Sequence, residues 1–353
     1  MMRLPPFALR HPRTIEEAAA WLAESPAETL LLGGGTDVVP NMKRRQQTPR
    51  TLIALRHVDA LGHVQHDAGL AIGAAVTLTE LVRDDRLRAI APGLWQAAAQ
   101  VATPHLRNMA TLGGNLCLDT RCTYYDQTYE WRKAIGFCMK KDGEICWVAT
   151  SSPRCLAVSS TDTAPMLQAL DAQVRLVSAS GTRTVALADL YRLDGMHYLT
   201  RQPDEILTDV LVPDQTGVRS TYWKLRRRGS IDFPVASAAV AARLTPDRRV
   251  DQIRIVLGAV ASRPLPATQS EAVLTGGALS DEAIAAAAEA AYTIAKPMDN
   301  TDYELIWRKR MTRALVTYAL REIRGDDVRE LRRRIARMDM LMPGAPQPGA
   351  PYV

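Results

Sequence analysis

The stretch ETLLLGGGTDVVPNMK, residues 28–43, joins a short apolar run to three consecutive glycines, which Thr36 and Asp37 follow. The apolar run predicts a strand. Glycines after a strand let the backbone approach a phosphate closely, with amide N–H groups as donors. The pattern is not a Rossmann fingerprint, because GxGxxG starting at Gly33 would need glycine where Val38 stands, and no Walker-type Lys–Ser/Thr follows. Taken alone, the stretch is equally compatible with a tight turn and with phosphate binding.

A second glycine turn lies in NMATLGGNLCL, residues 108–118. Two such loops would suit the opposite sides of a pyrophosphate, with hydroxyl groups from Thr36 and Thr111. Asp162, at a turn before a short expected helix, is a candidate for binding ribose or polar ring atoms. The sequence alone does not bring the two loops together in space.

The bulk properties indicate a globular protein of two or three domains. The chain has 353 residues and a net charge of +6, with basic runs at 43–50, 224–230 and 329–338. Aromatic residues are not interleaved with these runs as a single-strand binder requires, so we expect solvated or docking surfaces and no nucleic acid. Apolar runs are too short to span a membrane, and the first residues lack the apolar core of a signal peptide. We therefore expect a cytoplasmic location and no membrane association.

Four of the five cysteines lie in RCTYYDQTYEWRKAIGFCMKKDGEICWVATSSPRC, residues 121–155. The spacing shows neither the CxxC pairs of common zinc sites nor the CxxCxxC run of bacterial ferredoxins. Clustered cysteines in a cytoplasmic protein indicate metal or redox groups rather than disulfides. A polar, loop-rich segment of this length also needs something to hold it in place. An iron–sulfur cluster, a zinc ion and free thiols all remain open, and Cys117 is the least probable ligand.

The remaining periodicity predicts alternating helices and strands. Helices are expected from Thr14, which forms a capping box with Glu17, and in 77–87, 92–102, 280–296 and 302–323. Strands are expected in 51–58, 69–78, 172–179, 204–213, 221–227, 234–245 and 250–260. Strands followed by helices after residue 220 predict a separate α+β domain. The tail, 324–353, begins charged and helical and ends in a Pro-rich arm.

In this order, LLLGGGTDVVPNMK, ATLGGNL, STDTAPMLQALDA, DEILTDVLVP and YWKLRRRGSIDFPVASAAVA resemble a known family. It is the FAD-binding medium subunit of molybdenum hydroxylases, which includes xanthine dehydrogenase and carbon monoxide dehydrogenase. The resemblance implies an α+β fold: a vanillyl-alcohol-oxidase (PCMH)-type FAD-binding domain of two subdomains, then a C-terminal α+β domain of the carbon monoxide dehydrogenase flavoprotein type. The implied boundaries are 1–57, 58–216, 217–323 and a tail at 324–353.

The resemblance also implies which residues surround the cofactor. The first loop and Gly113-Gly114 would hold the FAD pyrophosphate, Leu207 and Val101 would be apolar neighbours, and Lys224 would be a basic group near the flavin. The family pattern offers no catalytic acid or base, because the flavin performs the chemistry. The complete implied set is Leu31, Leu32, Gly33, Gly34, Gly35, Thr36, Asp37, Val101, Thr111, Gly113, Gly114, Asn115, Asp162, Leu207 and Lys224.

The cysteine segment departs from ordinary family members. Asn115 and Asp162 are 47 positions apart (162 − 115), and the surplus is an insertion at about 118–157. The β subunit of 4-hydroxybenzoyl-CoA reductase is the branch known for such an insertion, where it carries a [4Fe-4S] cluster. That likeness implies a cluster bound by Cys122, Cys138, Cys146 and Cys155.

The implied function is electron transfer within a molybdenum reductase of anaerobic aromatic degradation. Reduced ferredoxin would supply electrons through [4Fe-4S] and FAD to a [2Fe-2S] small subunit and a molybdopterin large subunit, in a dimer of heterotrimers, for the dehydroxylation of 4-hydroxybenzoyl-CoA. A hydroxylase or dehydrogenase running electrons outward from another aromatic or heterocyclic substrate is the alternative. A stand-alone flavin oxidase would need its own acid and base, and His105 is the best-placed of the six histidines. A zinc-stabilised protein without flavin is a further alternative.

Overall fold

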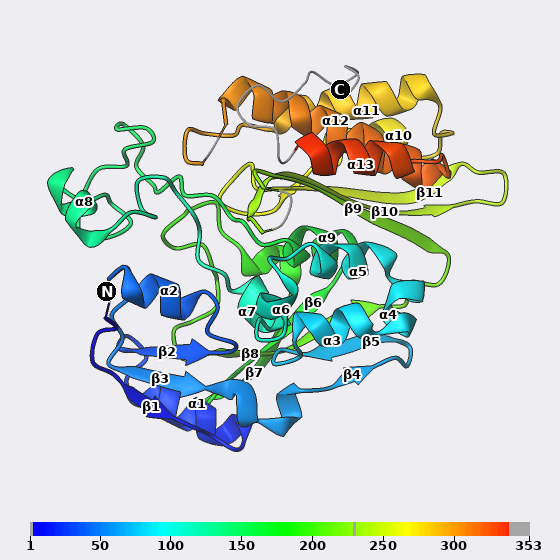
Figure 1. Cartoon of the computed structure of the whole chain (residues 1–353). Helices are drawn as coiled ribbons and strands as arrows, with labels where there is room; N and C mark the ends of the chain where they lie inside the picture. Colours follow the sequence, from blue (N-terminus) through cyan, green and yellow to red (C-terminus); the bar gives the residue numbers. More distant parts are fainter. Residues whose placement is uncertain (1–2, 229–230, 302, 339–353) are drawn as a thin grey trace.

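The computed structural model describes residues 3–228, 231–301 and 303–338, arranged around three β-sheets. Figure 1 shows the two larger sheets stacked with a layer of helices between them, and the smallest sheet beside the lower one. A further layer of helices covers the outer face of the C-terminal sheet (Figure 1). The predicted Pro-rich arm lies outside the described residues.

The smallest sheet is parallel and has the order β1-β3-β2, from β1 (Ala8–Arg10), β3 (Thr51–Ala54) and β2 (Thr29–Leu32). Helix α1 (Ile15–Glu24) packs on it through Ala18, Ala19 and Leu22. Thr14 caps this helix by accepting from the N–H of Glu17 at 3.1 Å. The predicted capping box is only half formed, because the Glu17 carboxylate accepts from the N–H of Arg13 instead. The short helix α2 (Val38–Lys43) follows the glycines.

The second sheet is antiparallel and has the order β4-β5-β8-β6-β7. Its buried side chains and those of the helices above it form the largest hydrophobic core cluster. The strands are β4 (Val64–Gln65), β5 (Gly69–Gly73), β6 (Gln173–Ser178), β7 (Gly181–Ala186) and β8 (Ile206–Pro213). The helices of this part are α3 (Leu78–Arg83), α4 (Asp85–Ile90), α5 (Pro92–Ala99), α6 (Pro104–Arg107), α7 (Leu112–Leu116) and α9 (Thr163–Ala169), with 3₁₀ turns η1 (Leu55–His57), η2 (Asp59–Leu61) and η3 (Leu187–Leu190).

The third sheet is antiparallel, with the order β12-β11-β10-β9, and belongs to the C-terminal part. Strand β10 is buried over most of its length because α12 covers one face and α5 and α9 approach the other. Its strands are β9 (Val218–Arg226), β10 (Pro234–Leu244), β11 (Val250–Gly258) and β12 (Leu265–Pro266), and its helices α10 (Thr268–Leu274), α11 (Asp281–Ile294), α12 (Leu305–Arg324) and α13 (Arg329–Met338). Strands followed by helices appear here as the sequence predicts.

The cysteine segment contains one helix, α8 (Tyr129–Ala134), and is otherwise irregular. Figure 1 shows α8 standing away from the three sheets. The segment begins and ends at one place, because Arg121 and Val158 form a β-bridge with N–H···O distances of 2.8 and 2.7 Å. No helix within the described residues is long and apolar enough to cross a membrane.

Candidate cofactor sites

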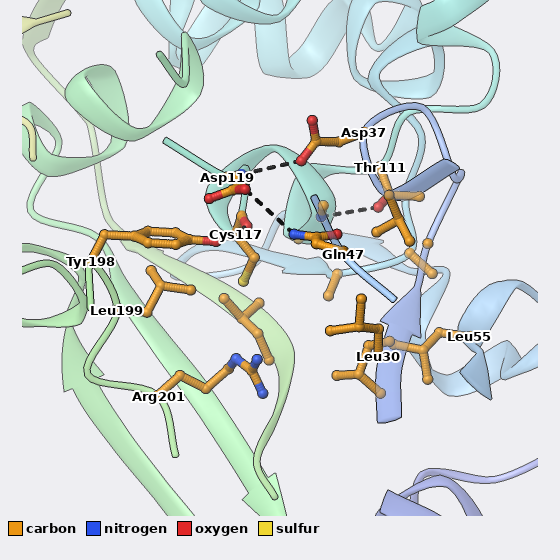
Figure 2. Close-up of a pocket in the computed structure, with 18 residues that line it drawn as sticks. Leu30, Asp37, Gln47, Leu55, Thr111, Cys117, Asp119, Tyr198, Leu199 and Arg201 are labelled. Carbon is orange, nitrogen blue, oxygen red and sulfur yellow. Dashed lines mark hydrogen bonds between the residues drawn. The ribbon is translucent and has the colours of Figure 1, made fainter. Parts of the chain in front are cut away.

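Two adjoining cavities, of about 150 and 360 Å³, lie where the first glycine loop meets α7. Leu31, Gly33, Asp37, Thr111 and Gly114 line both of them. Figure 2 shows the smaller cavity, with Thr111 and Asp37 on one side and Tyr198, Leu199 and Arg201 on the other. The two glycine loops that lie far apart in the sequence therefore form one continuous site, which we call the flavin cavity.

The glycines are required because neighbouring atoms occupy the space that a Cβ would need. A Cβ atom on Gly34 would lie 1.6 Å from the carbonyl oxygen of Met109, and one on Gly33 would lie 2.7 Å from Thr111 Oγ1. A Cβ on Gly113 would lie 2.7 Å from that of Ala74. Real Cβ contacts are longer than these distances, so no side chain fits at the first two positions without movement of the loops.

The two loops differ in the donors that they offer. The amide N–H groups of Gly34, Gly35 and Thr36 donate to no acceptor among the described residues. In the second loop, Gly113 N–H donates to Ala74 O at 2.9 Å and Gly114 N–H donates to Thr111 Oγ1 at 3.1 Å. The first loop is therefore the source of free backbone donors for an anionic group, whereas the second allows close approach without side chains.

Asp162 occupies the N-cap position of α9 but does not cap it. Its carboxylate accepts from Lys224 Nζ at 3.0 Å and from the Tyr222 hydroxyl at 2.8 Å. Lys224 is fully buried behind it and also donates to the carbonyls of Gln100 and Asp232, each at 2.9 Å. Complete burial raises the pKa of Asp162 above the ordinary aspartate value, and the neighbouring ammonium opposes that rise. Asp162 lines the larger cavity, whereas Lys224 lies behind it and lines neither cavity.

The other residues predicted to bind the cofactor are divided between the two cavities. Val101 lines the larger cavity and Leu207 the smaller one. Asn115 lines the larger cavity, and its side-chain oxygen accepts from the hydroxyls of Thr161 and Thr163 at 2.8 and 2.7 Å, which fixes α7 against α9. Leu32 and Lys224 are not among the residues that line either cavity.

Arg121 is a cavity residue that the sequence did not single out. Its guanidinium pairs with Asp37 and stacks 4.5 Å from the ring centroid of Phe233, and both residues line the larger cavity. Burial raises the pKa of Asp37, against the opposing effect of Arg121. Arg121 begins the cysteine segment and belongs to no motif. It was therefore identifiable as a cavity residue only from the structure, in which it lies beside the glycine loop.

The four cysteines of the insertion line one small cavity, of about 10 Å³, which we call the cysteine cavity. All four are buried, at 5–7% exposure, and the remaining lining includes Tyr125, Lys140 and Trp147 but no carboxylate or histidine. Burial raises the pKa of Cys122 to about 12 and that of Cys155 to about 11. Cys117 lines the flavin cavity instead. The four cysteines that surround this cavity are Cys122, Cys138, Cys146 and Cys155.

Comparison with known proteins identifies the chain's two parts. Residues 5–215 match the FAD binding domain in molybdopterin dehydrogenase, and residues 220–323 match the CO dehydrogenase flavoprotein C-terminal domain. The chain is an FAD-binding medium subunit of the molybdenum hydroxylase family. The medium subunit is 32% identical to the aldehyde oxidoreductase FAD-binding subunit PaoB of Escherichia coli, over 89% of this chain and 98% of that protein.

This medium subunit also resembles carbon monoxide dehydrogenase. It is 28% identical to the medium chain from Afipia carboxidovorans, over 89% of this chain and 95% of that protein. A crystal structure of the Cu,Mo-CO dehydrogenase superposes with a TM-score of 0.76 at 27% identity, covering 92% of this chain and 99% of the other. These matches confirm the predicted fold class and FAD binding, and they place the medium subunit in a multi-subunit oxidoreductase.

The cysteine cavity has no such confirmation in the medium subunit. Within the described residues, no three His, Cys, Asp or Glu side chains are grouped so as to hold a metal ion. What the structure does show is that an irregular segment brings its four thiols to one enclosed place.

Proposed function

We propose that this medium subunit transfers electrons between a [4Fe-4S] cluster, held by the four cysteines of the insertion, and the FAD in its flavin cavity. The observation that carries the proposal is the convergence of Cys122, Cys138, Cys146 and Cys155 on one buried cavity. When bound, the two cofactors accept and release electrons at low potential, which cysteine-ligated clusters reach. The chain's own part is to hold both groups in a fixed arrangement and to exclude water.

The donor set fits an iron–sulfur cluster, because four thiols and no carboxylate or histidine line the cysteine cavity. Four cysteines also suit a structural zinc ion, so the choice of a cluster comes from the family resemblance of the insertion. The cysteine cavity is small, so binding a cluster requires its loops to move outward. Their irregular backbone, with left-handed residues at Phe137 and Asp142, imposes no regular hydrogen-bond ladder against that movement.

In the flavin cavity, we propose that the chain binds FAD through the residues that the family resemblance implies. The free amides of Gly34, Gly35 and Thr36 suit the pyrophosphate, because they are unpaired donors on a glycine-rich loop that allows close approach. The Asp162 carboxylate, which Lys224 holds from behind, would provide a polar wall, while Val101 and Leu207 would provide apolar contacts.

We further propose that the electrons come from reduced ferredoxin. They would leave toward [2Fe-2S] and molybdopterin subunits in a dimer of heterotrimers that dehydroxylates 4-hydroxybenzoyl-CoA. The insertion supports this direction, because a donor of very negative potential needs a receiving centre of similar potential. On this proposal the chain contacts no aromatic substrate, and its neighbours in the complex are protein subunits.

The relatives support a second candidate, in which electrons run outward from an oxidised substrate. Their names are those of an aldehyde oxidoreductase, carbon monoxide dehydrogenases and a nicotinate dehydrogenase. In that case the cysteine-bound centre would pass electrons on to an acceptor. The reduction potentials separate the two candidates: a cluster potential below that of the flavin supports reduction, and the opposite order supports oxidation.

The experiment for the cysteine site is an iron count on the purified complex, with Cys138→Ser and Cys117→Ser as paired variants. We expect about four irons per FAD beyond those of the small subunit's clusters. We expect Cys138→Ser to lose that iron and its EPR signal while FAD stays bound, and Cys117→Ser to keep the iron. A wild-type complex with no additional iron would contradict the proposal.

A further inference from the structure

Resting on this proposed function, we propose that the buried ion pair between Lys140 and Asp119 links the two cofactor sites and tunes the reduction potential of the cysteine-bound centre. Lys140 lines the cysteine cavity, and Asp119 lines the flavin cavity. Their charged atoms, Nζ and Oδ1, are 2.7 Å apart. One ion pair therefore spans the wall between the two cavities.

The ammonium of Lys140 is held rigidly. Besides Asp119, Nζ donates to Thr120 Oγ1 at 2.6 Å and to Gly195 O at 2.7 Å. The ring centroids of Tyr125 and Tyr198 lie 4.8 and 5.3 Å from Lys140 Nζ, so the faces of two aromatic rings contact the cation. The Lys140 side chain is only 5% exposed. All three ammonium donors are thus directed at protein acceptors, and the charge has one fixed position.

Asp119 extends the link to the first glycine loop. Its Oδ2 accepts from the Tyr125 hydroxyl at 3.1 Å and from Gln47 Nε2 at 3.4 Å. Its amide N–H donates to Asp37 Oδ2 at 3.2 Å. Figure 2 shows Asp119 on the cavity wall with its bonds to Asp37 and Gln47. A continuous polar chain thus runs from the cysteine cavity to the loop that would carry the FAD pyrophosphate.

The position of the charge gives it an electrostatic effect on whatever the cysteines bind. A charge buried in a medium of low dielectric constant is felt more strongly than one in water. Reduction adds an electron, so a nearby cation favours the reduced form and raises the reduction potential. Asp119 lines the flavin cavity rather than the cysteine cavity. Its negative charge opposes the effect of the Lys140 ammonium on the reduction potential. The pair is neutral as a whole, so removal of either partner leaves a net buried charge.

The test is a set of four variants of the complete complex: Lys140→Met, Asp119→Asn, the double variant, and Lys141→Met as the matched control. Lys141 is the adjacent lysine, 31% exposed, and it pairs with Asp142 at the surface. Redox titration followed by EPR gives the cluster potential, flavin absorbance gives the FAD potential, and iron and FAD are counted in each preparation.

We expect Lys140→Met to shift the cluster potential to more negative values and Asp119→Asn to shift it to more positive values. The double variant restores neutrality and should return toward wild type, while Lys141→Met should not shift it. A merely structural pair would give shifts of one sign, or loss of iron that accumulates in the double variant, and this would overturn the inference. Unchanged potentials in all variants with full iron would also overturn it while leaving the proposed function intact. Absence of the extra iron from the wild type would instead reject both.

Discussion

At the scale of single residues, the contacts of the first glycine loop explain why glycine occupies position 34. GGG predicts close backbone approach, and the structure identifies what is approached: the carbonyl of Met109, against which Gly34 packs. The sequence could not name that partner, because it comes from the turn after α6, far along the chain. It likewise could not show that Asp162 would turn from its cap position to Lys224, because that lysine belongs to the C-terminal sheet.

We predict that Gly34→Ala destabilises the protein by about 3 kcal/mol, because an added methyl group forces the two loops apart. The same movement should remove most of the bound FAD. The ratio of flavin to protein absorbance and the denaturation midpoint measure both effects. Gly62→Ala is the matched control, since its Cβ would meet nothing closer than 3.5 Å and Gly62 already has a negative φ. Equal flavin content in the two variants would contradict this prediction.

At the scale of elements, Glu205 organises the segment that leads into β8. Its carboxylate accepts from Arg183 Nε and Nη2 on β7, at 2.6 and 2.8 Å, and from the N–H of Gln202 at 2.7 Å. The segment also carries Leu199 and Arg201 to the wall of the flavin cavity. The hydrogen bonds from Arg183 hold the pKa of Glu205 below its ordinary value.

We predict that Glu205→Gln lowers the free energy of unfolding by about 1 kcal/mol at pH 7, a modest loss because Arg183 is 41% exposed. A carboxyl with a lowered folded-state pKa stabilises the fold above its ordinary value of 4.5 and loses that contribution as the pH falls through the folded-state pKa. In denaturant titrations, the difference between wild type and variant should therefore stay constant from pH 7 to about 4.5 and shrink as the pH falls further. A difference for Glu205→Gln that stays constant below pH 4.5 would count against the assignment.

Most elements were predictable because their periodicity is strong, as in the helices expected at 280–296 and 302–323. The predicted elements differ from the structure where specific hydrogen bonds override the hydrophobic periodicity. A single helix was expected over 77–87, but Asp84 breaks it by capping α4 through the N–H of Leu87 at 2.9 Å. The strand expected at 51–58 ends at Ala54 and continues as a 3₁₀ turn. The second glycine turn became α7, because Val76 and Ala74 supply acceptors for its first amides, and a long-range contact of this kind leaves no local signal.

At the scale of the whole molecule, hydrogen bonds anchor the cysteine segment to both the N-terminal and the C-terminal parts of the chain. Gln46 Nε2 donates to Tyr125 O at 2.6 Å from the N-terminal part. Asn300, in the C-terminal part, accepts from Thr123 N–H at 2.9 Å and donates through Nδ2 to Leu156 O at 2.6 Å. The sequence predicted that such a segment needs an anchor, and composition pointed to a metal centre, but these protein anchors could not be foreseen from either.

We predict that Asn300→Ala leaves the Leu156 carbonyl without its donor and loosens the end of the cysteine segment. Limited proteolysis should then cut within 118–157 several times faster than in wild type, because cleavage follows local opening. FAD content should stay the same, since Asn300 does not line the flavin cavity. The control is Asn108→Ala, which removes only an exposed bond to Thr79. Equal cleavage rates in the two variants would show that Asn300 is not an anchor.

The bridge between Arg121 and Val158 has a consequence for the history of the chain. The segment between those two residues starts and ends at one spot, so its length adds no distance that the flanking backbone has to span. A gene could therefore acquire the intervening codons in one event without displacing the glycine loops on one side or Asp162 on the other. Whole cofactor modules are easiest to gain where a chain already passes close beside itself.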